Sequence, residues 1–467
     1  MGLFKSDEKK LINEINNKNI KKVKSILENS NKNKNIINLN EKNKNDDYPF
    51  LKAISNNNVE IVKLLIEYAS QHHVILELNE KNKDGVYPIL EAFRNNNVEI
   101  IKILQVYANQ HKIILKLNDK NKDENYPLLW TIHNNNIEAV NLLIEYANEH
   151  QIIFELNEKN KKGNYPILEA LRNNNFDIIK LLMEYASQHQ IDLEINKKDS
   201  DGYYPLYWAI SNNNIDVIKL LIEFAKQHNV ILDLNEKNKN GNYLLLKSIF
   251  NNNAEIVKLL IEYANDHQII IELNDKNEYE YYPLLEAIYN NNVEIIKLLI
   301  EYVSQNKIIL KLNEKDKNGN YPLYWAIYNN NIEIVKLLIE YANQHQVILE
   351  LNDKNEYGYY PLLEATYKND IEIVKILIEY ANQHQVILEL NEKNKYGQDP
   401  YYWAIENNNN EIIRLLFKYA NEHQIVLYSG ERKRVNKYIN KYYVINKYIK
   451  IKREKNILLC NYKIISI

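Results

Sequence analysis

The chain has 467 residues, too many for a single compact core, and its 59 Lys and Arg residues are balanced by 62 Asp and Glu residues. The resulting net charge of −3 argues against general affinity for nucleic acid. The single cysteine, Cys460, excludes an internal disulfide framework and a cysteine-rich metal site. No apolar run approaches the ~18–20 residues of a membrane span, and the N-terminus lacks an apolar signal-peptide core. We therefore expect a cytoplasmic protein.

The chain begins with MGLFKS, which matches the N-myristoylation pattern M-G-x-x-x-[ST] with Gly2 as the acceptor. Asp7 and Glu8 follow the motif directly, and a single acyl chain gives only marginal anchoring. We assign residues 1–9 to an N-terminal tail. Unless Gly2 is acylated, we expect no association with a membrane.

One period organises the rest of the chain. The nine prolines recur every 39 residues except for one gap of 78, whose midpoint is Leu244. Seven of the nine glycines lie three residues before these sites. Ten units with one period predict a stacked solenoid, in which each unit buries its apolar face against its neighbours.

Each unit is predicted to form a turn, a helix, a second turn and a second helix. The glycine permits the positive φ of a tight turn, and the proline takes the first position of a short helix such as PLLEAIY. That helix ends at NNN, where Asn can adopt the left-handed conformation and the third Asn can cap the next helix. The second helix, EIVKLLIEYANQHQ, has apolar residues at helical spacing. A polar stretch such as ELNEKNKDG then predicts an extended two-stranded finger, so we expect an all-α fold with short β-turn or finger connections.

This unit resembles the ankyrin repeat. GNYPLYWAI stands where that family has G-x-T-P-L-H-x-A-A, NNNIEIVKLLIEYA corresponds to x-G-H-L-E-I-V-K-L-L-L-x-x-G, and ELN fits D-V-N. The resemblance implies one elongated α-solenoid of helix-turn-helix repeats, with a degenerate N-terminal capping repeat at residues 10–48 and ten repeats at 49–427. A HEAT-like helical solenoid is the alternative, but it does not explain a glycine-containing finger in each unit.

The units depart from the family pattern in three ways. Tyr replaces Thr before the proline in nine of the ten units, and Asn replaces Gly-His between the helices. Each unit is also six residues longer than the usual ~33. We place these residues in the second helix, which would lengthen it by ~9 Å.

The third residue after each proline lies ~150° from the centre of the apolar face of the first helix. The resemblance implies that this position belongs to the concave, partner-facing surface. All four tryptophans occupy it, and the other six units have Lys or Glu there. Trp is among the residues most enriched at interface hot spots. At this position we predict partner-binding roles for Trp130, Trp208, Trp325, Trp403, Glu286 and Glu364. The alternative is structural, because each Trp could instead stack on a finger and fill a groove.

Tyrosines extend the predicted surface. Two of them, Tyr289 and Tyr328, lie six residues after a proline and therefore further along the first helix. Tyr is also enriched at interfaces, and the fingers of the later units are rich in it. The predicted partner-binding residues of the fingers are Tyr279, Tyr281, Tyr357 and Tyr359.

Nine histidines share one position near the end of the second helix. A metal site needs several imidazoles at ~2 Å from one ion, whereas equivalent helices in a stack lie ~8–10 Å apart. We therefore interpret these histidines as residues that finish the helix. No phosphate loop or catalytic set appears in the sequence, so we predict no enzyme activity, no metal, no cofactor and no small-molecule substrate.

The units also repeat at a higher level. The third position after the proline reads Lys, Glu, Trp, Glu, Trp and then repeats this series, and KIILKLN occurs at 112–118 and again 195 residues later, at 307–313. We infer a duplicated five-repeat block, about 37–231 and 232–426, with two similar aromatic patches. Residues 428–467 form a basic C-terminal tail, which is a cap, a segment that contacts the acidic array, or an unnatural end of the reading frame.

The sequence thus predicts a non-catalytic scaffold or adaptor that binds a protein partner through its first-helix and finger surface. Two alternatives remain open at this point. One is an N-myristoylated, membrane-tethered adaptor, and the other is the substrate-recognition subunit of a larger complex such as a ubiquitin ligase.

Overall fold

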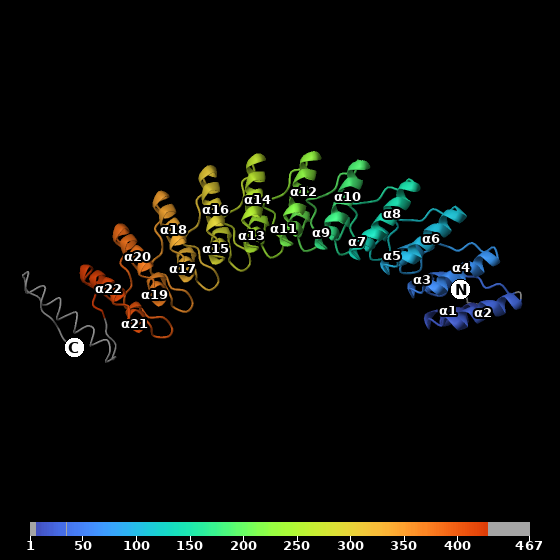
Figure 1. Ribbon diagram of the computed structural model, residues 1–467, viewed down its shortest axis with the longest axis horizontal. Helices are drawn as coiled ribbons and strands as arrows, with labels where there is room; N and C mark the ends of the chain where they lie inside the picture. Colours follow the sequence, from blue (N-terminus) through green and yellow to red (C-terminus); the bar gives the residue numbers. More distant parts are fainter. Residues whose placement is uncertain (1–5, 34, 428–467) are drawn as a thin grey trace, which may run out of the picture. The chain divides into compact units, whose positions relative to one another are not determined.

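The computed structural model describes residues 6–33 and 35–427, which contain 22 helices and no strand (Figure 1). Within these residues no helix is long and apolar enough to cross a membrane. Gly2 and the basic tail at 428–467 lie outside the described residues. The chain divides into two compact units, Met1–Ile271 and Glu272–Ile467, which we treat separately.

Short and long helices alternate along the chain after the first pair, α1 (Ser6–Asn16) and α2 (Ile20–Lys32). The short helices, which we call first helices, are α3 (Pro49–Ser55), α5 (Pro88–Arg94), α7 (Pro127–His133), α9 (Pro166–Arg172), α11 (Pro205–Ser211), α13 (Leu244–Phe250), α15 (Pro283–Tyr289), α17 (Pro322–Tyr328), α19 (Pro361–Tyr367) and α21 (Pro400–Glu406). The long helices, or second helices, are α4 (Val59–Gln71), α6 (Val98–His111), α8 (Ile137–Glu149), α10 (Phe176–Gln188), α12 (Ile215–Gln227), α14 (Ala254–Asp266), α16 (Val293–Asn306), α18 (Ile332–Gln344), α20 (Ile371–His384) and α22 (Asn410–Glu422).

Helices α1 and α2 form the pair predicted as a degenerate capping repeat. Leu11 and Ile15 on α1 and Val23 on α2 are fully buried, and α1 packs on both α2 and α3. Because α1 begins at Ser6, residues 6–9 belong to this helix and not to a tail.

The turn between the two helices of a repeat has the geometry that the asparagine run predicts. In the repeat of α5 and α6, Pro88 takes the first helical position after an extended Tyr87 (φ −142°). Asn96 has a left-handed backbone (φ 53°), and the Asn97 side chain accepts a hydrogen bond from the N–H of Ile100 at 3.0 Å. These two asparagines end one helix and start the next, because they satisfy backbone groups that the helix ends leave free.

The second helix is only slightly longer than its sequence counterpart in the ankyrin pattern, so the predicted six-residue extension is wrong. In α4 the helix continues two residues past Ala69 and ends at Gln71. His73 then adopts a left-handed backbone (φ 54°), and the N–H of Val74 donates to the carbonyl of Ala69 at 2.8 Å. This bond belongs to a helix-ending motif whose left-handed residue is usually glycine. Here His73 takes that position. The remaining extra residues follow the helix as non-helical chain.

The connection between repeats is a tight turn and not the predicted two-stranded finger. The first connection that contains a glycine shows this turn. The N–H of Gly85 donates to the carbonyl of Asn82 at 3.0 Å, and φ at Gly85 is 75°. A Cβ at this position would lie 2.8 Å from the Cα of Asn121 in the next finger. The left-handed backbone and the close stacking of successive fingers therefore favour glycine, although Asp46, Glu124 and Glu280 adopt the same backbone in three equivalent fingers.

Polar side chains fasten each repeat to its neighbour. Tyr126, which precedes Pro127, is fully buried, and its hydroxyl donates to the carbonyls of Glu155 and Glu158 at 3.0 and 3.1 Å. The side-chain amide of Asn134 donates to the carbonyl of Phe93 at 2.8 Å. Within each unit, first helices pack on first helices and second helices on second helices, so they form two rows (Figure 1).

Candidate functional site

The four tryptophans all lie on first helices, and each is half-buried. Each also contacts the side chain six residues after the proline, either in its own repeat or in the preceding one. Trp208 lies 5.2 Å from the Arg172 guanidinium, Trp325 lies 4.8 Å from the Tyr289 ring, and Trp403 lies 4.6 Å from the Tyr367 ring. Trp208, Trp325 and Trp403 therefore bridge neighbouring first helices, whereas Trp130 contacts His133 of its own helix, and part of each ring stays accessible.

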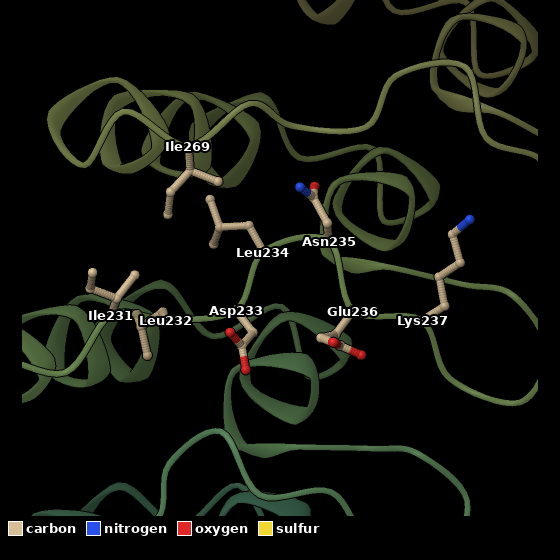
Figure 2. A pocket seen from close by; sticks show the side chains of 8 residues that line it. All are labelled: Ile231, Leu232, Asp233, Leu234, Asn235, Glu236, Lys237 and Ile269. Carbon is tan, nitrogen blue, oxygen red and sulfur yellow. The ribbon is translucent and has the colours of Figure 1, made fainter.

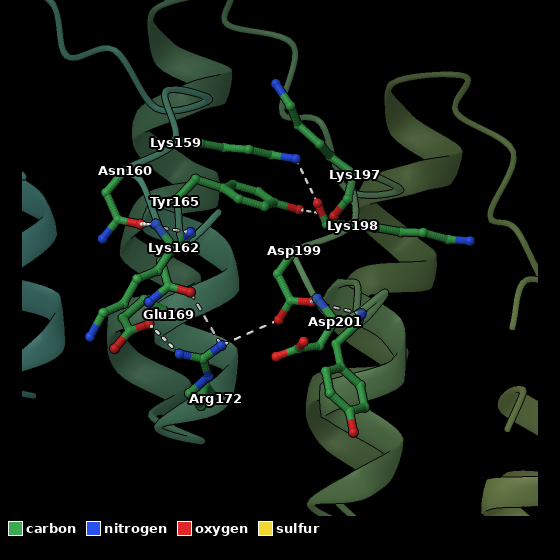
Figure 3. Close-up of polar contacts among 12 residues, drawn as sticks. Lys159, Asn160, Lys162, Tyr165, Glu169, Arg172, Lys197, Lys198, Asp199 and Asp201 are labelled. Carbon is green, nitrogen blue, oxygen red and sulfur yellow. Dashed lines mark hydrogen bonds and ion pairs between the residues drawn. The ribbon is translucent and has the colours of Figure 1, made fainter. Parts of the chain in front are cut away.

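In the first unit, Arg172 on α9 organises a cluster of charges (Figure 3). Its Nη1 lies 3.1 Å from Glu169 Oε2, and its Nη2 lies 3.3 Å from Asp199 Oδ2 in the next finger. His133 Nδ1 lies 2.7 Å from the other oxygen of Glu169. The guanidinium thus lies between two carboxylates and the Trp208 ring, and its charge is already compensated within the chain.

In the second unit, aromatic rings occupy the corresponding positions. Trp325 packs edge-on against both Tyr289 and Tyr328, at 4.8 and 5.1 Å between ring centroids. Tyr367 packs against Trp403 in the same manner, at 4.6 Å. These rings, with the finger residues that touch them, form what we call the aromatic surface: Tyr281, Tyr289, Trp325, Tyr328, Tyr359, Tyr367 and Trp403.

The finger tyrosines differ in exposure. Tyr279 and Tyr357, at the tips of their turns, are more than half exposed. Tyr281 and Tyr359 are half-buried and lie 6.2 and 6.3 Å from Tyr289 and Tyr367. The structure therefore brings the second pair onto the aromatic surface through ring contacts, whereas Tyr279 and Tyr357 stand at the rim of the fingers.

The indole nitrogens distinguish Trp325 from the other three tryptophans. Trp325 Nε1 donates to Asp316 Oδ2 in its own finger at 3.2 Å. The Nε1 atoms of Trp130, Trp208 and Trp403 are buried and have no hydrogen-bond partner among the described residues. Most fingers have Asn where Asp316 lies, and in the finger of Trp208 the equivalent Asp199 pairs with Arg172 instead. Trp325 is therefore fixed by a bond that the other three tryptophans lack among the described residues.

Comparison with known protein families decides the nature of the repeat. The family described as ankyrin repeats (3 copies) matches residues 11–114, 106–193, 148–231, 188–271, 226–311, 264–349 and 344–426. The chain belongs to the ankyrin repeat family. A search of curated proteins gave no match. Ankyrin repeats are a general protein–protein interaction module and are typically non-catalytic.

Two of the predicted site residues of this ankyrin array lie elsewhere than expected. Glu286 and Glu364 are only 4% and 2% exposed, so the prediction that they lie on the accessible surface is wrong. Burial raises the pKa of both carboxyls above the usual value. The reason for their burial is packing between repeats, because a Glu side chain is short enough to end inside the layer of first helices, whereas Trp reaches beyond it.

The two five-repeat blocks inferred from the sequence differ in the residue next to this buried carboxylate. In the first block Glu91 and Glu169 are followed three residues later by Arg94 and Arg172. In the second block the equivalent residues are Tyr289 and Tyr367. The tryptophans therefore have similar positions in both blocks but different neighbours, charged in one and aromatic in the other.

The histidines near the helix ends take part in the packing between repeats. His150 stacks on Tyr146 at 4.2 Å, and its Nε2 lies 2.9 Å from Asn109 Oδ1 in the preceding repeat. His384 has the equivalent contacts with Tyr380 and Asn343. Among residues 6–33 and 35–427, no group of three or more His, Cys, Asp or Glu side chains is placed to hold a metal ion.

One exposed feature was not selected from the sequence. Each of nine repeats has an isoleucine after its second helix that is 52–60% exposed, at Ile36, Ile75, Ile114, Ile153, Ile231, Ile270, Ile309, Ile348 and Ile387. The signal was available, because these isoleucines alternate with buried leucines in segments such as VILELN. From the sequence we predict accessible surface only on the first helices and the fingers.

An open depression lies beside one of these isoleucines in the first unit (Figure 2). It is lined by residues 231–237 and Ile269, from the segment between α12 and α13 and the equivalent segment after α14. Leu234 and Ile269 face each other, whereas Asp233 and Glu236 point to the opposite side (Figure 2). The polar groups do not converge as they do in sites for small molecules.

Proposed function

We propose that this ankyrin array is a non-catalytic scaffold, acting in the cytoplasm, that binds a protein partner mainly through the aromatic surface of its second unit. One observation carries this proposal. Seven Trp and Tyr side chains lie in two groups of ring contacts, each across two neighbouring repeats, and Lys368 lies near a ring of each group. Three of the seven, Tyr289, Tyr328 and Tyr367, are 43–46% exposed.

The chemistry of these rings supports a binding role. Large aromatic side chains contribute much contact area at little cost in conformational entropy, and Trp and Tyr are enriched among interface hot spots. Tyr279 and Tyr357 at the finger tips, and the ring of Trp325 that Asp316 holds in place, add to the accessible aromatic area. We place the partner across the first helices α15, α17, α19 and α21 and the fingers that precede them.

The test uses the full chain as bait in a chemical cross-linking pull-down, followed by affinity measurement with each captured protein. Trp325→Ala and Trp403→Ala should each weaken binding by ~2 kcal/mol or more, as removal of hot-spot residues does. The unfolding midpoint should change less in these variants than the affinity does. Trp130→Ala and Trp208→Ala then show whether the first unit contributes a second contact.

A matched control is Ile348→Ala, which removes an exposed apolar side chain (55% exposed) outside the aromatic surface. It should leave the affinity unchanged. If all four tryptophan variants bind like the unmodified chain, or if they lose stability and not affinity, the tryptophans are structural and the proposal fails.

A further inference from the structure

The duplicated blocks contain the same buried carboxylate with and without a neighbouring cation. In α5 and α9 an arginine follows the glutamate by three residues, and in α15 and α19 a tyrosine replaces that arginine. The helices are otherwise closely similar. The first block therefore shows how an arginine of the chain itself pairs with this buried carboxylate.

In the first unit the arginines reach carboxylates that are almost fully buried. Arg94 Nη2 lies 2.7 Å from Oε1 of Glu91, although Glu91 is only 1% exposed. Arg172 makes the same ion pair with Glu169 and also lies 5.2 Å from the Trp208 ring. A guanidinium that comes from the surface side can therefore reach the buried carboxylate and stack on the tryptophan at the same time.

In the second unit neither equivalent carboxylate makes a hydrogen bond to an arginine or lysine of residues 272–427. No Lys or Arg of residues 272–427 pairs with Glu286, which accepts one hydrogen bond from the Asn290 amide at 3.2 Å. Glu364 Oε2 accepts from the Tyr324 hydroxyl at 3.3 Å, but Oε1 is buried without a hydrogen bond. A buried carboxylate without a close cation is costly, and this cost is relieved if a cation binds.

One cation of the chain already lies at the edge of this site. Lys368 Nζ is 4.3 Å from the Tyr328 ring centroid, 5.8 Å from that of Tyr367, and 3.8 Å from Glu364 Oε1. The other nine repeats have Asn at this position. The arrangement of two tyrosine rings and a buried carboxylate thus attracts a positive charge, although Lys368 stays too far from Oε1 for a hydrogen bond.

We propose that the aromatic surface recognises a basic partner segment whose arginine side chains pack against Tyr289 and Tyr367, the residues that replace Arg94 and Arg172, with Glu286 and Glu364 as counter-charges. This proposal rests on the proposed function and adds the chemical class of the partner. Charge complementarity selects the occupant, because Glu286 has no Lys or Arg partner among residues 272–427 and Glu364 has only the distant Lys368, and both lie near rings whose faces bind cations. Arginine fits better than lysine, since its planar group both stacks on Trp and pairs with a carboxylate.

The experiment measures fluorescence anisotropy of labelled ten-residue peptides in which Gly alternates with Arg, Lys or Glu, titrated with the full chain. We expect the Arg peptide to bind about tenfold more tightly than the Lys peptide, as one extra charge-assisted hydrogen bond would give, and the Glu peptide not to bind. Glu286→Gln with Glu364→Gln should weaken binding of the Arg peptide by about tenfold or more. Tyr289→Arg with Tyr367→Arg should abolish it, because these variants restore the internal cation of the first block.

Two controls separate this site from general attraction to an acidic array. Glu333→Gln with Glu372→Gln removes the same charge from exposed residues of α18 and α20 and should leave binding unchanged. Arg94→Tyr with Arg172→Tyr converts the first block to the pattern of the second and should increase the number of Arg peptides bound. This gain cannot come from loss of folding.

The proposal is overturned if the Glu286 and Glu364 variants bind the Arg peptide as the unmodified chain does, or lose no more affinity than the exposed controls. It is also overturned if the peptide binds only after the Lys and Arg residues of 431–467 are replaced by Gln, since the occupant is then the chain's own tail. If a captured partner depends on Trp325 and Trp403 but not on these carboxylates, the scaffold function stands and only the basic-segment proposal fails.

Discussion

The hydroxyl of Tyr263 accepts a hydrogen bond from the backbone N–H of Leu232 at 3.0 Å, and so ties the second helix α14 to the segment that leaves the preceding repeat. The same bond joins Tyr107 to Leu76 and Tyr341 to Leu310. In α12 the equivalent residue is Phe224, which has no hydroxyl, and the N–H of Leu193 has no acceptor among residues 35–427.

Phe224→Tyr should therefore stabilise the chain. The added hydroxyl would satisfy the buried N–H of Leu193 and could donate to the carbonyl of Ile191, which should raise the free energy of unfolding by ~0.5–1.5 kcal/mol. Urea denaturation followed by circular dichroism measures this change. The matched control is Tyr263→Phe, which should lower the free energy of unfolding by a similar amount. If Phe224→Tyr left the stability unchanged, the site would have no room for the hydroxyl.

Tyr126, immediately before Pro127, should be sensitive to removal of its hydroxyl. Tyr126 is fully buried, and removal of its hydroxyl would break the bonds to the carbonyls of both Glu155 and Glu158, so Tyr126→Phe should cost ~1–3 kcal/mol. The loss is expected in thermal or urea unfolding. Tyr396→Phe is a suitable comparison, because Tyr396 is 66% exposed and should lose less. Equal losses would contradict the role of these two bonds.

The hydrogen bond between Trp325 and Asp316 predicts that the tryptophans differ in their tolerance of Phe. Trp325→Phe removes a donor from a carboxylate and should cost ~1 kcal/mol more than Trp130→Phe, whose indole N–H is buried without a partner. Paired denaturation curves of the two variants measure the difference. A larger loss in Trp130→Phe would mean that ring packing, and not this hydrogen bond, decides the stability.

Much of this architecture could be predicted from the sequence because it is local. The proline position, the left-handed Asn96 and the capping Asn97 follow from the backbone preferences of single residues, and the structure confirms each of them. The length of the second helix could not be predicted in this way. A residue such as Gln151 ends the helix in the left-handed conformation, which is uncommon for a residue other than glycine, Asn, Asp or His.

The candidate site was predicted only in part, because its geometry depends on neighbouring repeats. In an isolated first helix, the third position after the proline points away from the apolar face. This is true of both Trp325 and Glu286. In the stack, first helices also pack on both neighbouring first helices within a unit, so the layer covers a short side chain and leaves a long one accessible. The exposed isoleucines were missed for a similar reason, since they follow the helices in a segment predicted only as a connection.

The buried carboxylate of Glu286 should make stability depend on pH. Burial raises its pKa in the folded chain above the usual value, so the folded state holds this proton more tightly than the unfolded state does. The contribution of Glu286 is therefore most favourable below the usual pKa of ~4.3 and decreases as the pH rises through the raised value. Above that pH, folding must bury a charged group.

Glu286→Gln should remove this penalty while keeping an acceptor for the Asn290 amide. We expect the variant and the unmodified chain to have the same urea midpoint near pH 4 or below, and the variant to be more stable at pH 7, with the difference appearing as the pH rises. Glu333→Gln is the control, because Glu333 is exposed and paired with Lys297 and should show no such gain. A difference that stays constant across this pH range, or a Gln variant that is less stable at pH 7, would mean that the charged form of Glu286 is compensated in the folded chain.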